Sequence, residues 1–117
     1  ICTNQSLLAL RSTIYMALLG KYGMPHISKL CFQKAQYTAD RIIKLPSYSL
    51  KYGAQFIKEF VIETIHNVEN LTRYCLKEGF LIMDISDNLD QCFQIAVTEK
   101  RTKQEIDKFI KCLENYK

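Results

Sequence analysis

The feature that most constrains the fold of this chain is a change of hydrophobic period at Pro46. Before Pro46, apolar residues recur every three or four positions, which is the spacing of one face of a helix. After it, Tyr48, Leu50 and Tyr52 alternate with polar residues, as in a half-buried strand. The change therefore predicts a helical first part and a second part that contains strands.

The first part reads as two helices with a tight connection between them. Thr3 or Asn4 can cap the first helix through a side-chain oxygen, and Gly20 supplies a C-terminal stop. The second helix begins at about Pro25, whose fixed φ suits a first helical turn, and ends before the next proline. We therefore expect a helical hairpin over residues 1–45.

The second part, residues 46–117, mixes strand and helix patterns. Strands are predicted over residues 48–52, 56–64, 80–85 and 92–97, and helices over 67–79 and 102–113. Asn67 and the capping-box pattern Thr102-Lys-Gln-Glu105 mark the helix starts, because their side-chain oxygens can accept from free N–H groups. The last helix has one apolar face, made of Ile106, Phe109, Ile110 and Leu113. The order ααββαββα predicts an α+β fold, with a mainly antiparallel sheet covered by helices.

Length and charge narrow the class of protein. A chain of 117 residues that begins at Ile1 rather than Met is expected to be a single domain, the C-terminal fragment of a larger chain. No apolar run reaches the ~20 residues that cross a bilayer, so no membrane partner is expected. The formal net charge of +4 is scattered among acidic residues. Nucleic-acid binders concentrate basic residues on one face, so we expect no nucleic acid either.

The five cysteines indicate a reducing compartment. They stand at positions 2, 31, 75, 92 and 112, without the close spacing of a metal or redox motif. Four of them have apolar neighbours, as in Leu30-Cys31-Phe32. We interpret them as reduced core residues of a cytoplasmic protein rather than as disulfide or metal ligands.

The residues alone predict no catalytic, cofactor-binding or metal-binding site. The glycines stand singly and match no phosphate-binding loop. His26 and His66 have no second ligand at helical spacing, so no metal is expected. Asp84, Asp87 and Asp90 flank a turn, and hydrogen bonding within that turn accounts for them.

Several segments nevertheless resemble one known family. They are Ile1-Cys-Thr-Asn-Gln-Ser-Leu-Leu-Ala-Leu with Ile14-Tyr-Met-Ala-Leu-Leu-Gly20, then Lys34-Ala-Gln-Tyr, Gln55-Phe-Ile-Lys-Glu-Phe-Val-Ile, and Ile95-Ala-Val-Thr-Glu-Lys-Arg-Thr-Lys-Gln-Glu-Ile-Asp107. In order and spacing they are similar to the small C-terminal domain of subunit 1 of the two-subunit glycine dehydrogenase (decarboxylating), the P-protein of the glycine cleavage system. The resemblance covers nearly the whole chain and favours subunit 1 over subunit 2.

The resemblance implies a fold-type I enzyme dependent on pyridoxal phosphate. In the two-subunit form, the lysine that holds the cofactor lies in subunit 2, and subunit 1 is a catalytically silent homologue needed for assembly. The complex decarboxylates glycine and passes the aminomethyl group to the lipoyl arm of the H-protein. The implied partners are therefore subunit 2 and the H-protein, and this fragment itself holds no cofactor. Thr3, Asn4 and Gln5 would lie where the chain leaves the large domain, either facing the inter-domain cleft or capping the helix.

Two alternatives remain open at this point. The same small domain occurs in other fold-type I enzymes, such as a cysteine desulfurase or a class V aminotransferase. There an arginine of this domain commonly binds the substrate carboxylate, and the candidates are Arg11, Arg41, Arg73 and Arg101, none of which stands in such a motif. A free-standing nucleic-acid-binding module is the other alternative, and the scattered charge disfavours it.

Overall fold

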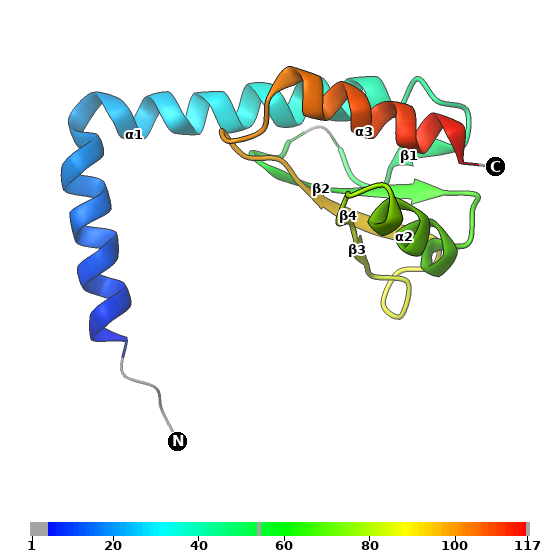
Figure 1. The fold of residues 1–117 in the computed structure, drawn as a ribbon, viewed down its shortest axis with the longest axis horizontal. Coiled ribbons are helices and arrows are strands. Elements are labelled where there is room, and N and C mark those ends of the chain that lie inside the picture. Colours follow the sequence, from blue (N-terminus) through cyan, green and yellow to red (C-terminus); the bar gives the residue numbers. More distant parts are fainter. Residues whose placement is uncertain (1–4, 54, 117) are drawn as a thin grey trace.

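The α+β fold expected from the change of period is present in the computed structural model, which describes residues 5–53 and 55–116 (Figure 1). Within them, three helices accompany a four-stranded antiparallel sheet of order β1-β2-β4-β3. The elements in chain order are α1 (Ser6–Ile42), β1 (Tyr48–Leu50), β2 (Glu59–Thr64), α2 (Val68–Lys77), β3 (Met83–Asp84), β4 (Cys92–Ala96) and α3 (Lys103–Asn115).

The first element differs from the expected hairpin, because α1 is one helix with a sharp bend. Gly20, with φ 61° and ψ −166°, is the residue inside α1 that leaves the helical region. The helix resumes at once, so there is no loop to reverse the chain, and the two arms diverge (Figure 1). Gly23 helps the bend, because a Cβ there would lie 3.0 Å from Leu19 Cβ. The predicted caps Thr3 and Asn4 lie outside the described residues, and Gln5 holds the N-cap position.

Alternation along β2 and β4 divides the sheet into two faces. Phe60 pairs with Ile95, and Ile62 pairs with Phe93, and all four side chains are buried in the core. The next pair along the strands, Glu59 and Ala96, is exposed on the opposite face. The arm of α1 after the bend packs beside α3, and all three helices contribute buried residues to the same core cluster as the strands.

All four strands are shorter than expected, and β3 differs most from its predicted range. The segment predicted over residues 80–85 pairs only as Met83–Asp84, at an edge of the sheet. Gly79 has φ 86°, and Phe80 N–H donates to Cys75 C=O at 2.8 Å. This six-to-one bond belongs to a helix C-terminus, so it withdraws the start of the segment from the sheet. The strand predicted over 56–64 likewise begins at Glu59.

The start signals of the last two helices are confirmed. The Asn67 side chain accepts from Asn70 N–H, and Thr102 and Glu105 form both halves of a capping box. On α3 the four predicted core residues are buried, and Cys112 joins them. On α2, Val68, Leu71 and Cys75 are buried, whereas Leu76, which has the same apolar spacing, is 60% exposed.

Candidate functional site

The histidines and aspartates that the sequence singled out lie in different parts of the fold. His26 is exposed on α1, whereas the His66 ring lies 5.0 Å from the Tyr116 ring. Asp84 accepts from the Ser86 backbone N–H at 2.8 Å and from its hydroxyl at 2.6 Å, which confirms its role in the turn. Among residues 5–53 and 55–116, no group of three potential ligands could hold a metal ion.

Three of the four candidate arginines pair with carboxylates of the chain itself. Arg73 pairs with Glu69 at 2.6 Å on the surface of α2, and Arg101 lies 3.5 Å from Glu105. Arg41 lies 3.2 Å from Asp107. The fourth, Arg11, is exposed on the first arm of α1. The structure does not bring these arginines together at one site.

A polar cluster joins α1 to α3. The Tyr37 hydroxyl donates to Asp107 Oδ1 at 2.6 Å, and Arg41 Nη1 donates to the Tyr37 oxygen at 2.8 Å. Lys103 donates to the other carboxylate oxygen of Asp107. Hydrogen bonds from Lys103 and then Tyr37 lower the pKa of Asp107, because they stabilise its charged form. The cluster holds the two helices in register, and Tyr37 and Asp107 were not singled out from the sequence.

A second joint lies nearer the bend. Lys34 Nζ donates to the Glu99 carbonyl, and the Cys31 thiol donates to Glu99 Oε2 at 3.4 Å. The pKa of Glu99 is lowered, chiefly by a backbone hydrogen bond and then by Cys31. A signal in the sequence could have found this joint: Lys34 interrupts the helical spacing of apolar residues between Cys31 and Ile42, and an ammonium group on a buried face needs a partner.

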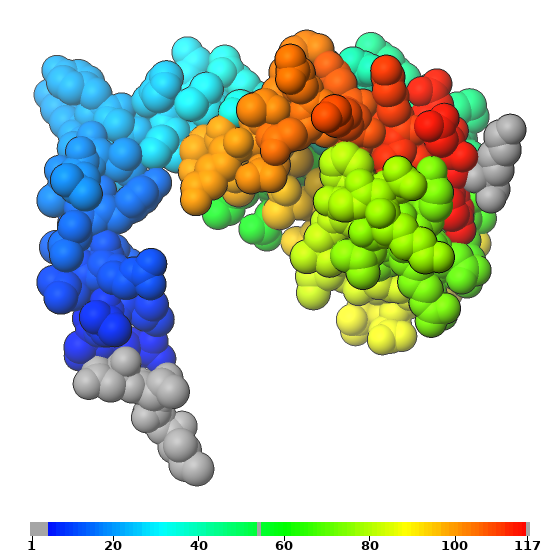
Figure 2. Space-filling view, in the orientation of Figure 1, coloured from blue at the N-terminus to red at the C-terminus, as the bar shows by residue number. Residues whose placement is uncertain are grey.

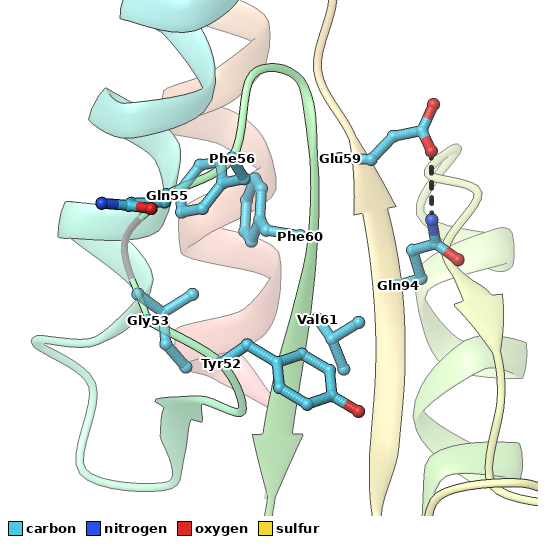
Figure 3. A pocket seen from close by; sticks show the side chains of 9 residues that line it. Tyr52, Gly53, Gln55, Phe56, Glu59, Phe60, Val61 and Gln94 are labelled. Atoms are coloured by element: carbon cyan, nitrogen blue, oxygen red, sulfur yellow. Dashed lines mark hydrogen bonds between the residues drawn. The ribbon is translucent and has the colours of Figure 1, made fainter.

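A hollow of about 180 Å³ opens at one edge of the sheet (Figure 3). The rings of Phe56 and Phe60, 4.8 Å apart, form its apolar side, and Tyr52 lines it as well. Glu59 accepts a hydrogen bond from Gln94 Nε2 at 3.3 Å on the strands beside it. The charged residue in this lining is a carboxylate, so the hollow does not suit an anionic ligand.

An uncovered apolar surface lies on α1 before the bend. We call residues 6–19 the exposed arm, and Figure 2 shows it standing away from the rest of the molecule. Its side chains include Leu7 at 68%, Ile14 at 51% and Leu18 at 82% exposure. Scattered apolar residues are normal on a surface, but a run of this length marks an interaction site. No helix in the described part of the chain is long and apolar enough to cross a membrane.

A helix-covered antiparallel sheet is the fold expected for the small domain of a fold-type I enzyme, and solved structures share it. A solved glycine decarboxylase (P-protein) of the glycine cleavage system, in inhibitor-bound form, superposes with a TM-score of 0.88 at 21% identity, over 97% of this chain and 26% of that one. The cystine C–S lyase C-DES gives 0.70 at 10% identity, over 79% of this chain and 24% of that one. These likenesses establish the fold.

Sequence comparison identifies the family. A family model described as the glycine cleavage system P-protein matches residues 1–113. "Probable glycine dehydrogenase (decarboxylating) subunit 1" of Chlorobium limicola is 45% identical over 114 residues, 97% of this chain and 26% of that protein. Its namesake from Chlorobaculum tepidum is 43% identical over 111 residues, 94% of this chain and 25% of that protein. The chain therefore belongs to the P-protein family of the glycine cleavage system, and it spans about a quarter of the length of these subunit 1 relatives.

The hollow beside β2 does not fit pyridoxal phosphate, the cofactor of this fold class. Pyridoxal phosphate needs a lysine for its Schiff base and a cradle for its phosphate. The hollow beside β2 is lined by neither lysine nor arginine. Lys34, Lys51 and Lys103 donate to oxygens of Glu99, Glu63 and Asp107. We therefore assign no residue of this chain to the cofactor.

Proposed function

We propose that this chain is the non-catalytic small domain of subunit 1 of glycine decarboxylase and that it supports assembly of the complex. The observation that carries the proposal is 45% identity over 114 residues to a subunit 1 protein. The match to the family extends through the exposed arm as well as the sheet. The complex would decarboxylate glycine and transfer the aminomethyl group to the lipoyl H-protein, with pyridoxal phosphate as electron sink.

The proposal includes the domain organisation and the partners. Residues 1–117 form one domain, and residues 1–45, which include α1, connect it to the large domain of the parent chain. The exposed arm supports this arrangement, because side chains such as Leu18, 82% exposed, gain stability only when another surface covers them. Subunit 2 carries the cofactor lysine and is the direct partner, and the H-protein docks on the assembled complex in the cytoplasm.

Other fold-type I enzymes are not favoured as parents. The cystine C–S lyase resembles this chain at 10% identity, which supports a shared fold and nothing narrower. A substrate-binding arginine would distinguish such an enzyme. Arg41 and Arg101, however, are engaged by carboxylates of this chain.

The proposal is tested by reconstitution. Full-length subunit 1, subunit 2 and H-protein should together release carbon dioxide from glycine, and removing this chain from subunit 1 should abolish both release and complex formation. The isolated chain, given pyridoxal phosphate, should neither form an absorbance band that borohydride traps on a lysine nor release carbon dioxide. A trapped lysine, or full activity without this chain, would contradict the non-catalytic assembly role.

A further inference from the structure

Two thiols face each other between α2 and α3. The Cys112 thiol donates to Cys75 Sγ at 4.0 Å, although the residues are 37 positions apart in the sequence. Both cysteines are free and buried, with Cys75 at 0% and Cys112 at 6% exposure. In contrast, the thiol of Cys31 points to a carboxylate. The fold therefore brings together two thiols whose proximity could not be predicted from the wide spacing of the cysteines in the sequence.

One member of the pair can be reached from outside. Cys112 lines a hollow of about 270 Å³ between α2 and α3, together with Tyr74, Phe80, Lys108 and Lys111. A water molecule takes about 30 Å³ of liquid, so the hollow has room for a small oxidant such as hydrogen peroxide. Cys75 does not line this hollow. The Cys112 sulfur thus lies at the hollow, and the Cys75 sulfur lies behind it.

We propose that Cys112 and Cys75 form a reversible disulfide when the protein meets a peroxide. The Cys112 thiolate attacks one peroxide oxygen, the O–O bond breaks, and Cys112 becomes a sulfenic acid while hydroxide takes up a proton to leave as water. The Cys75 sulfur then attacks the sulfenic sulfur, and the S–O bond breaks to release a second water. In sum, two thiols lose two electrons and two protons, and one peroxide is reduced to two waters. A cellular dithiol reverses the step by exchange.

Burial of the two thiols determines which of them reacts first and how fast. It raises the pKa of the Cys75 thiol to about 12, and it also raises the pKa of the Cys112 thiol. The thiolate is the reactive form, so the reaction is slow, and Cys112 reacts first because it lines the hollow. Closure requires the sulfurs to approach from 4.0 Å to about 2.05 Å. The link then ties α2 to α3, and the pair stays reduced in a resting cell.

The test is peptide mapping of the full-length protein that contains this chain. The protein is treated with hydrogen peroxide, its remaining thiols are blocked with N-ethylmaleimide under denaturing conditions, and it is digested without reductant. We expect a linked peptide pair containing Cys75 and Cys112, two hydrogens lighter than the sum of the free peptides and released by dithiothreitol. Overoxidised Cys112 beside a blocked Cys75, or both thiols blocked, would overturn the proposal.

Variants separate the two roles. In Cys75→Ser the sulfenic acid has no resolving partner, so dimedone should label Cys112 several-fold more than in the wild type. The control Cys31→Ser should keep the Cys75–Cys112 link, because Cys31 lies at a different joint. Equal dimedone labelling of Cys112 with and without Cys75 would contradict the pairing. Mapping of the wild-type protein decides the matter if Cys75→Ser fails to fold.

Discussion

Phe109 and Lys108 are neighbours on α3 with opposite environments. Phe109 is 8% exposed and lies 5.3 Å from the Phe80 ring, whereas Lys108 is exposed. Phe109→Ala removes a buried ring and leaves a cavity, so it should lower the free energy of unfolding by about 3–5 kcal/mol. Such a loss is a large share of the total stability of a small domain. Urea denaturation of the 117-residue chain measures it.

Lys108→Ala is the matched control and should change the free energy of unfolding by less than about 0.5 kcal/mol. Equal unfolding midpoints for the two variants would mean that the apolar stripe of α3 is not core.

Asp107 makes stability depend on pH. Hydrogen bonds from Lys103 and Tyr37 lower its pKa in the folded state. A carboxyl with a lowered folded pKa stabilises the fold above its unfolded pKa, about 3.9 for Asp, and this contribution disappears as pH falls through the folded pKa. Asp107→Asn should therefore flatten the acid side of the stability profile. Glu99 and Glu105 also have lowered pKa values, so some acid dependence should remain.

Urea titrations at a series of acidic pH values measure this profile. Tyr37→Phe removes one donor to Asp107 and should fall between the wild type and Asp107→Asn. Superimposable profiles for all three proteins would show that the cluster does not favour the charged carboxylate.

At the scale of elements, short sequence motifs correctly predicted the helix starts, which depend on contacts within a single turn. The capping box of Thr102 and Glu105 and the Asn67 cap fixed the helix starts, because each satisfies free N–H groups within one turn. The predicted helical hairpin was wrong because a glycine predicts where a helix is interrupted but not the direction in which the chain continues. The spacing in the exposed arm predicted a helix with an apolar face, and that spacing is the same for a face that packs on a core and for one that packs on a partner. The Cys75–Cys112 pair depends on packing between distant segments.

Gly20 should determine the direction of the exposed arm. Its φ of 61° with ψ of −166° lies in a region that is essentially restricted to glycine. A Cβ at Gly20 would meet nothing within 4 Å, so Gly20→Ala acts through backbone preference and not through a clash. Alanine favours helical dihedrals and should straighten α1. Small-angle scattering should then give a radius of gyration above that of the wild-type chain.

Gly53→Ala is the control for this measurement. Its added Cβ also meets nothing within 4 Å, but Gly53 lies outside α1 and should leave the scattering unchanged. An unchanged radius for Gly20→Ala would mean that packing, not Gly20, sets the bend.

At the scale of the whole molecule, the chain combines a well-packed α+β unit with an arm that its own core does not cover. The unit is joined to α1 by the Asp107 cluster and by the Glu99 joint, so the helix enters it at a fixed position. The family match includes both parts, and the subunit 1 relatives are about four times as long as this chain. These features support a domain whose task is to bind the rest of its protein rather than a substrate.

Leu18→Glu in the exposed arm tests this account most directly. Leu18 is 82% exposed, so the isolated chain should unfold at the wild-type urea concentration. In full-length subunit 1, however, the new carboxylate would be buried against the covering surface at a high cost in desolvation. The control Leu81→Glu, at an 85% exposed position outside the arm, should assemble normally.

The decisive measurement is sedimentation velocity of each full-length subunit 1 variant mixed with subunit 2. We expect the wild type and Leu81→Glu to sediment as a complex, and Leu18→Glu to remain as separate or aggregated subunits. A Leu18→Glu subunit that forms the complex with wild-type affinity would contradict the claim that the arm is an assembly surface.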